Sequence, residues 1–158
     1  MKKWILIIAV LLLLAAGGIY WLYTSTRAPL EAAKEYAEEI ASSEAGIVSI
    51  EEFYMYNGSE TYYVIIGKQE DEQEMVVWIP EDEEKKLVKK KLADGVSKQE
   101  VVNKLLAEEN PQEILNVTLG MENDLPIWEV SYINNDSKLN YYYIHFDSGK
   151  WWRKIENL

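Results

Sequence analysis

Among the side chains of this 158-residue chain that could do acid–base or metal chemistry, only one is a histidine. His145 lies in a run that alternates like a strand, so Tyr141 and Tyr143 are expected on its face. Asp147 follows two residues later and is expected to begin a turn. A metal site or a nucleophilic triad needs further ligands, or a serine, at set positions, and the sequence shows none. The pattern therefore predicts a structural or surface histidine.

Two runs of carboxylates are the other candidates for chemistry, at residues 70–72 and 81–84. Neither run has the alternating oxygen-ligand spacing of a calcium loop, and the chain has no cysteine for a thiolate zinc site. We interpret the first run as a solvated hairpin loop and the second as a helix start that matches the helix dipole. A carboxylate pair for glycan hydrolysis stays open, because the fold sets the separation of the two groups. We predict no catalytic residue, metal ligand or cofactor site.

The aromatic residues near the C-terminus are the candidate partner contacts: Tyr141, Tyr143 and Trp152. Neighbouring residues of a strand face opposite sides, so an inward Ile144 places Tyr141 and Tyr143 outward. Similar alternation places Trp151 inward and Trp152 outward. Exposed aromatic side chains on a sheet favour contact with a partner. The alternative, that they pack on cross-strand neighbours or cover a junction between units, stays open.

A charge-free apolar segment at residues 4–23 decides where the rest of the chain is expected to lie. Its length as a helix, about 30 Å, matches the hydrocarbon thickness of a bilayer. Lys2 and Lys3 precede it, so residues 1–3 are expected in the cytoplasm and the C-terminal part outside the cell. A cleaved signal peptide is the alternative, but the apolar run is longer than a typical signal. We therefore predict a single-pass membrane anchor that contacts lipid through residues 4–23.

The charge of the chain excludes one class of partner. The net charge is −11, and without Lys2 and Lys3 it is −13. Nucleic-acid binding needs a basic face for phosphate contacts, so no nucleic-acid role is expected.

Hydrophobic periodicity beyond the anchor predicts an α+β fold made of two tandem units. Each unit is expected to hold a helix and an antiparallel sheet. The first unit spans residues 27–80, a connecting helix lies within 81–95, and the second unit spans 96–158. The expected helices are 27–42, 81–92 and 98–109, and the expected strands are 47–56, 61–67, 74–80, 113–121, 126–133, 139–146 and 150–155.

The second unit resembles a PepSY-type domain. The residues that carry this resemblance are S-K-Q-E-V-V-N-K-L-L at 97–106, W-E-V-S-Y at 128–132 and Y-I-H-F-D-S-G-K at 143–150. The first unit is similar but degenerate, at residues 28–37, 62–67 and 76–80. With the apolar N-terminal segment, the ordered combination resembles the TseB (YpmB) family of Firmicutes, the cell wall elongation regulator TseB-like proteins.

The resemblance implies cystatin-like α+β units, no enzymatic activity, and a class B penicillin-binding protein as partner during cell elongation. It supplies no functional residues to carry across to this sequence. A module that inhibits or chaperones an extracellular protease, as PepSY units in propeptides do, is the alternative. The sequence leaves open whether the two units share one core.

Overall fold

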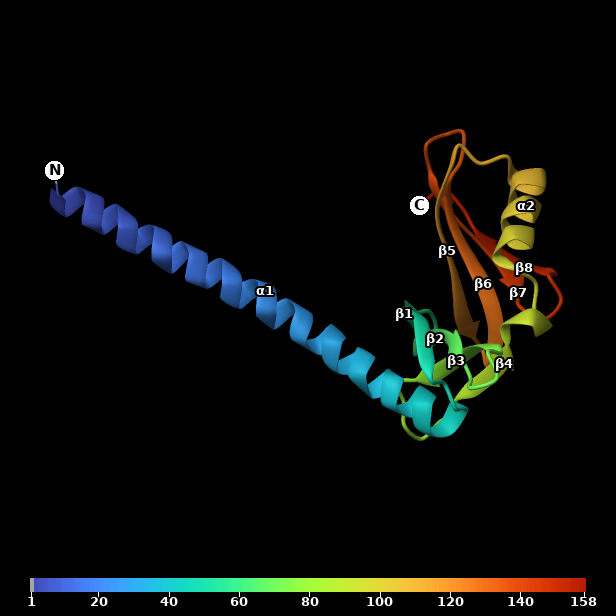
Figure 1. The fold of residues 1–158 in the computed structure, drawn as a ribbon. Helices are drawn as coiled ribbons and strands as arrows, with labels where there is room; N and C mark the ends of the chain where they lie inside the picture. Colours follow the sequence, from blue (N-terminus) through green and yellow to red (C-terminus); the bar gives the residue numbers. More distant parts are fainter. Residues whose placement is uncertain (1) are drawn as a thin grey trace. The chain divides into compact units, whose positions relative to one another are not determined.

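The computed structural model of the chain describes the backbone of residues 2–158 and the side chains of residues 12–15, 17–18 and 28–158. Two compact units form, Met1–Tyr36 and Ala37–Leu158. The elements in chain order are α1 (Lys2–Ala45), β1 (Ser49–Asn57), β2 (Thr61–Lys68), β3 (Glu74–Pro80), β4 (Val88–Lys91), the 3-10 turn η1 (Leu92–Asp94), α2 (Lys98–Glu109), β5 (Glu113–Glu122), β6 (Leu125–Ile133), β7 (Leu139–His145) and β8 (Trp151–Ile155) (Figure 1).

Most side chains of the predicted membrane segment, residues 4–23, lie outside the described residues. Among the described residues, no helix has both the length and the apolar character required to cross a bilayer. The helix predicted over residues 27–42 is confirmed as part of α1, but α1 continues through Pro29 rather than beginning there. Extending an existing helix costs less than nucleating a new one, so α1 tolerates the hydrogen bond lost at Pro29.

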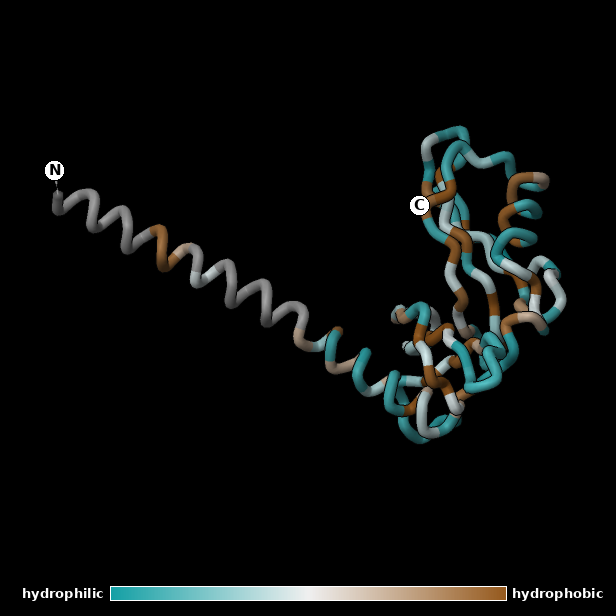
Figure 2. Tube along the Cα trace, viewed as in Figure 1, coloured by the Kyte–Doolittle hydropathy of each residue, from teal (hydrophilic) through white to brown (hydrophobic). Residues whose placement is uncertain are grey.

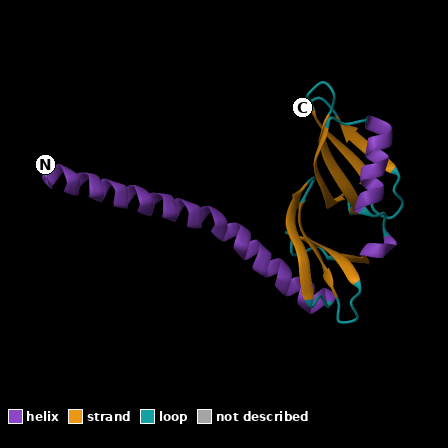
Figure 3. Cartoon of the chain, turned by 45° about the horizontal axis from the view of Figure 1, so that its top comes forward, coloured by secondary structure: helices purple, strands orange, loops and turns teal. Residues whose placement is uncertain are grey.

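The unit Ala37–Leu158 contains two antiparallel four-stranded sheets, which confirms the predicted α+β class (Figure 3). Strands follow each other in sequence order in both sheets, β1-β2-β3-β4 and β5-β6-β7-β8. Ala37, Ala41 and Ala45 recur at helical spacing and are fully buried in this unit. The end of α1 is joined to the first sheet by Gln69, whose Nε2 donates to the carbonyl oxygen of Ala45 at 2.8 Å.

The helix predicted over residues 81–92 is wrong. Residues 81–87 form turns, and residues 88–91 form strand β4, which pairs with β3 from Met75↔Lys91 to Trp78↔Val88. The run of acids followed by lysines fits a helix dipole, but it contains too few apolar residues for a buried helical stripe. The open edge of β3 offers a ladder of backbone hydrogen bonds instead, and this tertiary context overrides the local preference.

Helix α2 begins and ends where local signals predict. Ser97 caps it, because its Oγ accepts from the backbone N–H of Glu100 at 3.3 Å while its own N–H donates to the Glu100 carboxylate at 2.8 Å. Val101 and Leu105 are buried and form the stripe that packs on the second sheet. Asn110 ends the helix in the left-handed conformation, at φ 45°.

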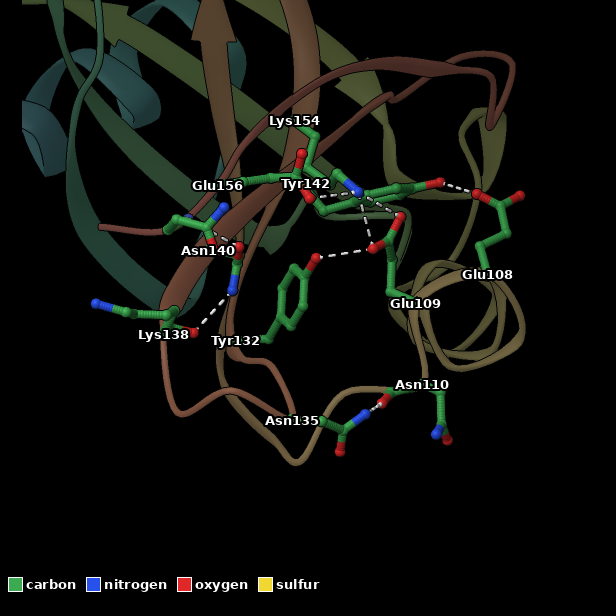
Figure 4. Close-up of polar contacts among 11 residues, drawn as sticks. Glu108, Glu109, Asn110, Tyr132, Asn135, Lys138, Asn140, Tyr142, Lys154 and Glu156 are labelled. Atoms are coloured by element: carbon green, nitrogen blue, oxygen red, sulfur yellow. Dashed lines mark hydrogen bonds and ion pairs between the residues drawn. The ribbon is translucent and has the colours of Figure 1, made fainter.

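Polar contacts join the C-terminal end of α2 to strands of the second sheet (Figure 4). The Tyr132 hydroxyl donates to the Glu109 carboxylate at 3.1 Å, and the Lys154 ammonium lies 3.0 Å from it. The Tyr142 hydroxyl donates to Glu108. Negative side chains at a helix C-terminus are unfavourable for the helix dipole, and these donors offset that cost.

The two halves of this unit repeat each other with a fixed spacing. Strand β1 begins at Ser49 and β5 at Glu113, 64 residues later, and the starts of β2 and β6 differ by the same number. A register shift follows the second residue of each first strand, between Ile50 and Glu52 in β1 and between Ile114 and Asn116 in β5. The strands and the register shift in the first strand are therefore repeated in the two halves.

The two sheets contribute to a single hydrophobic core, so the two halves are not separate in packing. Trp78 of β3 contacts Phe146 edge-on, with ring centroids 5.5 Å apart. Glycines allow the close approach: a Cβ at Gly95 would lie 2.2 Å from the Phe146 ring, and one at Gly120 would lie 2.5 Å from the Tyr56 ring. Hydrophobic residues concentrate in the strands, and hydrophilic residues in the turns (Figure 2).

Candidate functional site

The predicted contact residues Tyr141, Tyr143 and Trp152 come together on one face of the second sheet. The rings of Tyr141 and Tyr143 stack with centroids 6.5 Å apart. Trp152 meets Tyr143 edge-on at 6.0 Å. Because β7 alternates regularly, its two tyrosines share this face, opposite the face that α2 covers. With Arg153, described next, we call this group the aromatic cluster.

Arg153 is the member of this cluster that the sequence analysis missed. Its guanidinium carbon lies 4.5 Å from the centroid of the Tyr143 ring and 4.7 Å from that of Trp152. Such a cation over aromatic faces contributes attraction of about 0.5–2 kcal/mol. Nothing in the spacing of W-W-R-K-I singles out the arginine, because its partner on β7 is set by strand pairing.

Exposure of the cluster differs from the prediction. Tyr143 is 4% exposed, whereas Tyr141 and Trp152 are half-buried. Trp151, predicted to point inward, is 53% exposed. The reason is a bulge between β7 and β8, where Tyr143 pairs with Arg153 and Ile144 pairs with Trp151. The extra residue, Trp152, breaks the strict alternation on which the prediction rested.

A buried carboxylate lies behind the aromatic cluster. Glu122, at the end of β5, is 3% exposed and lies 3.5 Å from the Arg153 guanidinium. It accepts a hydrogen bond from the Tyr56 hydroxyl at 3.0 Å and another from the Ser59 backbone N–H at 3.2 Å. Since Tyr56 and Ser59 belong to the first half, Glu122 connects both halves to the cluster.

Burial changes the pKa of Tyr143 in the cluster and of Glu129, its neighbour on β6. Burial raises the pKa of Tyr143 to about 12, with a smaller contribution from the Glu129 charge. Burial also raises the pKa of the Glu129 carboxyl, and a hydrogen bond from Tyr143 opposes that rise. Tyr143 therefore stays protonated at neutral pH and acts as a hydrogen-bond donor.

The histidine and the acidic runs do not form a reactive group. His145 is half-buried and tilted against Trp152, with centroids 6.1 Å apart. Asp147 lies in the turn as predicted, and its carboxylate pairs with Lys90 at 2.6 Å instead of with His145. Residues 70–72 lie exposed between β2 and β3. Over the described part of the chain, no three His, Cys, Asp or Glu side chains are placed to hold a metal ion.

This chain is similar to known proteins in both sequence and fold. The model of a family described as the cell wall elongation regulator TseB-like domain matches residues 32–80. The probable cell wall elongation regulator TseB of Bacillus subtilis (strain 168) is 27% identical over 146 residues, which cover 92% of this chain and 88% of that protein. The resemblance to the TseB family is confirmed. The solved structure of the YpmB protein from Bacillus subtilis matches this TseB-like chain with a TM-score of 0.73 at 25% identity, covering 77% of this chain and 95% of that one. Both the family model and the Bacillus subtilis relative are described as cell wall elongation regulators.

Proposed function

We propose that this chain is a non-catalytic regulator of cell wall elongation that acts outside the cell by binding a membrane-bound enzyme of wall synthesis. The observation that carries the proposal is the similarity to the Bacillus subtilis regulator over 92% of this chain. The structure adds support, because Tyr141, Tyr143 and Trp152 pack against one another as a surface for contact. This arrangement differs from a nucleophile beside a base.

The proposed partner is a class B penicillin-binding protein, and the proposed contact surface is the aromatic cluster. Tyr141 and Trp152 remain half-exposed and are held rigid by stacking on Tyr143 and Arg153. Aromatic and arginine side chains supply much of the binding energy at protein interfaces, and rigid ones lose little entropy on binding.

The proposed location rests on residues 4–23, which supply an uncharged run of membrane-spanning length. An anchor of this kind would hold the two sheets on the same membrane as the proposed partner and raise its effective concentration. Cell fractionation tests it: the full chain should sediment with membranes, and a chain that lacks residues 1–26 should not. Recovery of a mature chain from the medium that begins beyond Tyr23 would overturn the anchor.

Co-purification tests the partner. The full chain, extracted from membranes with mild detergent, should recover a class B penicillin-binding protein. Trp152→Ala should reduce that recovery at least several-fold, since truncation of an interface anchor costs about 2 kcal/mol or more. Trp151→Ala is the matched control, because Trp151 is 53% exposed and has no ring contact among the described residues. Failure of the unaltered chain to recover such an enzyme, with normal cell elongation on deletion, would overturn the proposal.

The propeptide-like alternative has its own test. A module that inhibits or chaperones a secreted protease should slow peptide cleavage or raise the refolding yield of that protease. The proposed regulator should change neither quantity when the full chain is added.

A further inference from the structure

A groove between the two sheets lies apart from the aromatic cluster. It has a volume of about 520 Å³ and lies among β1, β2, η1, the start of α2 and the strands β5 and β6. Its apolar lining includes Ile66 of β2, Val117 of β5 and Trp128 of β6. Each sheet therefore contributes one wall, and the groove exists only because the two halves pack together.

The aromatic side chains of the groove are fixed by hydrogen bonds to the protein itself. The Tyr54 hydroxyl accepts from the Leu119 backbone N–H at 2.8 Å. The Trp128 Nε1–H donates to the Val96 carbonyl oxygen at 2.9 Å. Because their main polar contacts lie within the protein, these residues present apolar ring surface to the groove in a preformed arrangement.

The exposed rim of the groove is strongly acidic. Glu51, Glu52, Glu74 and Glu100 line it together with one cation, Lys98. The Glu51 carboxylate pairs with Lys68 at 2.9 Å, and Glu100 caps α2 through Ser97. Within the described residues, neither Glu52 nor Glu74 has a salt bridge. Glu74 lies opposite Lys68 in the register of β2 and β3, but it makes no close ion pair with it. Two carboxylates without a close ion pair thus flank an apolar lining.

We propose that this groove binds a basic peptide segment of the partner, which deepens the proposed function and rests on it. Lysine and arginine match both features of the groove, because their apolar stems can lie against its apolar lining while their charged ends reach Glu52 and Glu74 at the rim. The volume accommodates several side chains of such a segment, so the occupant is a peptide rather than a single ion.

Recognition goes through side chains, not through addition of a strand. The outward N–H of Leu119 on β5 already donates to Tyr54, and the N–H of Val117 donates to the Asn116 side chain at 3.0 Å. These contacts use the donors that an added strand beside β5 would need.

A labelled peptide of alternating lysine and leucine tests the groove. The full chain in zwitterionic detergent micelles is titrated into fluorescein-labelled Lys-Leu-Lys-Leu-Lys, with empty micelles as the blank and anisotropy as the readout. Binding should weaken as salt rises, because the charge pairs are exposed. The peptide Gln-Leu-Gln-Leu-Gln should bind at least several-fold more weakly.

Variants separate the groove from general attraction to an acidic protein. Glu52→Gln with Glu74→Gln should weaken binding about tenfold. Glu70→Gln with Glu83→Gln is the matched control. Both residues are exposed and lie outside the groove, and the two substitutions remove the same amount of charge. Equal weakening in the two double variants, equal binding of the glutamine peptide, or absence of binding at low salt would each overturn the groove.

The outcomes for groove and proposed function are separate. Peptide binding without co-purification of a wall-synthesis enzyme would overturn the proposed function and support the groove. Co-purification that survives the Glu52→Gln and Glu74→Gln double variant unchanged would overturn the groove as a partner site and leave the proposed function standing.

Discussion

Glu122 shows at the scale of one residue how the two halves are held together. Its carboxylate is buried and accepts from Tyr56 and Ser59 of the first half while facing Arg153 of the second. A buried carboxylate without partners would destabilise the fold, so its three donors are needed together.

Removing this carboxylate should destabilise the protein. Glu122→Ala leaves the Tyr56 hydroxyl, the Ser59 N–H and Arg153 without their acceptor, and it should lower the free energy of unfolding by about 2–4 kcal/mol. Urea unfolding of the full chain in detergent micelles measures the change. Glu113→Ala, at an exposed position of the same strand, should change it by less than about 0.5 kcal/mol. Equal stability of the two variants would mean that Glu122 does not link the halves.

Glu129 should make stability depend on pH. Burial raises the pKa of its carboxyl in the folded state above the ordinary value of 4.5, so the folded protein binds this proton more tightly than the unfolded one. The stability from this group is present below the unfolded pKa and is lost as pH rises through the folded pKa. Glu129→Gln, which stays neutral, should therefore be more stable than the unaltered chain at pH 7.5.

The same comparison near pH 4.5 provides the contrast. The advantage of Glu129→Gln should shrink there, because more of the unaltered carboxyl is protonated in the fold at that pH than at pH 7.5. Glu113→Gln removes an equal charge from an exposed site and should show no such pH-dependent gain. A stability loss for Glu129→Gln at pH 7.5 would contradict this assignment.

The sequence predicted the positions in the aromatic cluster that depend on alternation along one strand. It did not predict those that depend on the pairing of two strands. The shared face of Tyr141 and Tyr143 follows from their spacing on β7. The burial of Tyr143 and the place of Trp152 depend on the bulge in β8, and the role of Arg153 depends on its pairing with Tyr143. Bulges and cross-strand partners have no local signature in W-W-R-K-I.

At the scale of elements, α2 and β4 show what local sequence can decide. The limits of α2, residues 98–109, were predicted because cap, apolar stripe and stop signal all lie within a short stretch. Strand β4 was missed because its partner, the edge of β3, is specified by the fold and not by the residues of β4.

The cap of α2 gives a test at this scale. Ser97→Ala removes the acceptor for the Glu100 N–H and should lower the free energy of unfolding by about 1 kcal/mol. Ser97→Thr keeps a hydroxyl acceptor and should retain most of the stability. Urea unfolding compares the two, and equal losses for Ala and Thr would contradict the capping role.

The whole unit Ala37–Leu158 combines a repeated architecture with a common core. The repeated pattern of helix and strands was visible in the sequence, and the structure fixes the spacing of the first two strands at 64 residues. The sharing of the core was not, since the Trp78–Phe146 contact joins residues far apart in the chain.

A common core predicts cooperative unfolding of both halves. Phe146→Ala should lower the free energy of unfolding by about 3–5 kcal/mol, because a fully buried ring leaves a cavity against Trp78. Tryptophan fluorescence and far-UV circular dichroism should report one coincident transition, before and after the substitution. Leu106→Ala, at a 48% exposed site, is the control and should have little effect. Two separate transitions would show that the predicted units fold independently.

Strand β4 forms the outer edge of the first sheet and carries Lys89, Lys90 and Lys91 in succession. Lys90 is paired with Asp147, but Lys89 and Lys91 remain cationic, so like charges repel when two such edges approach each other. This edge of the sheet therefore has a barrier to self-association and fibre growth. We expect the chain to remain dispersed at concentrations where a neutral edge of the same length would aggregate.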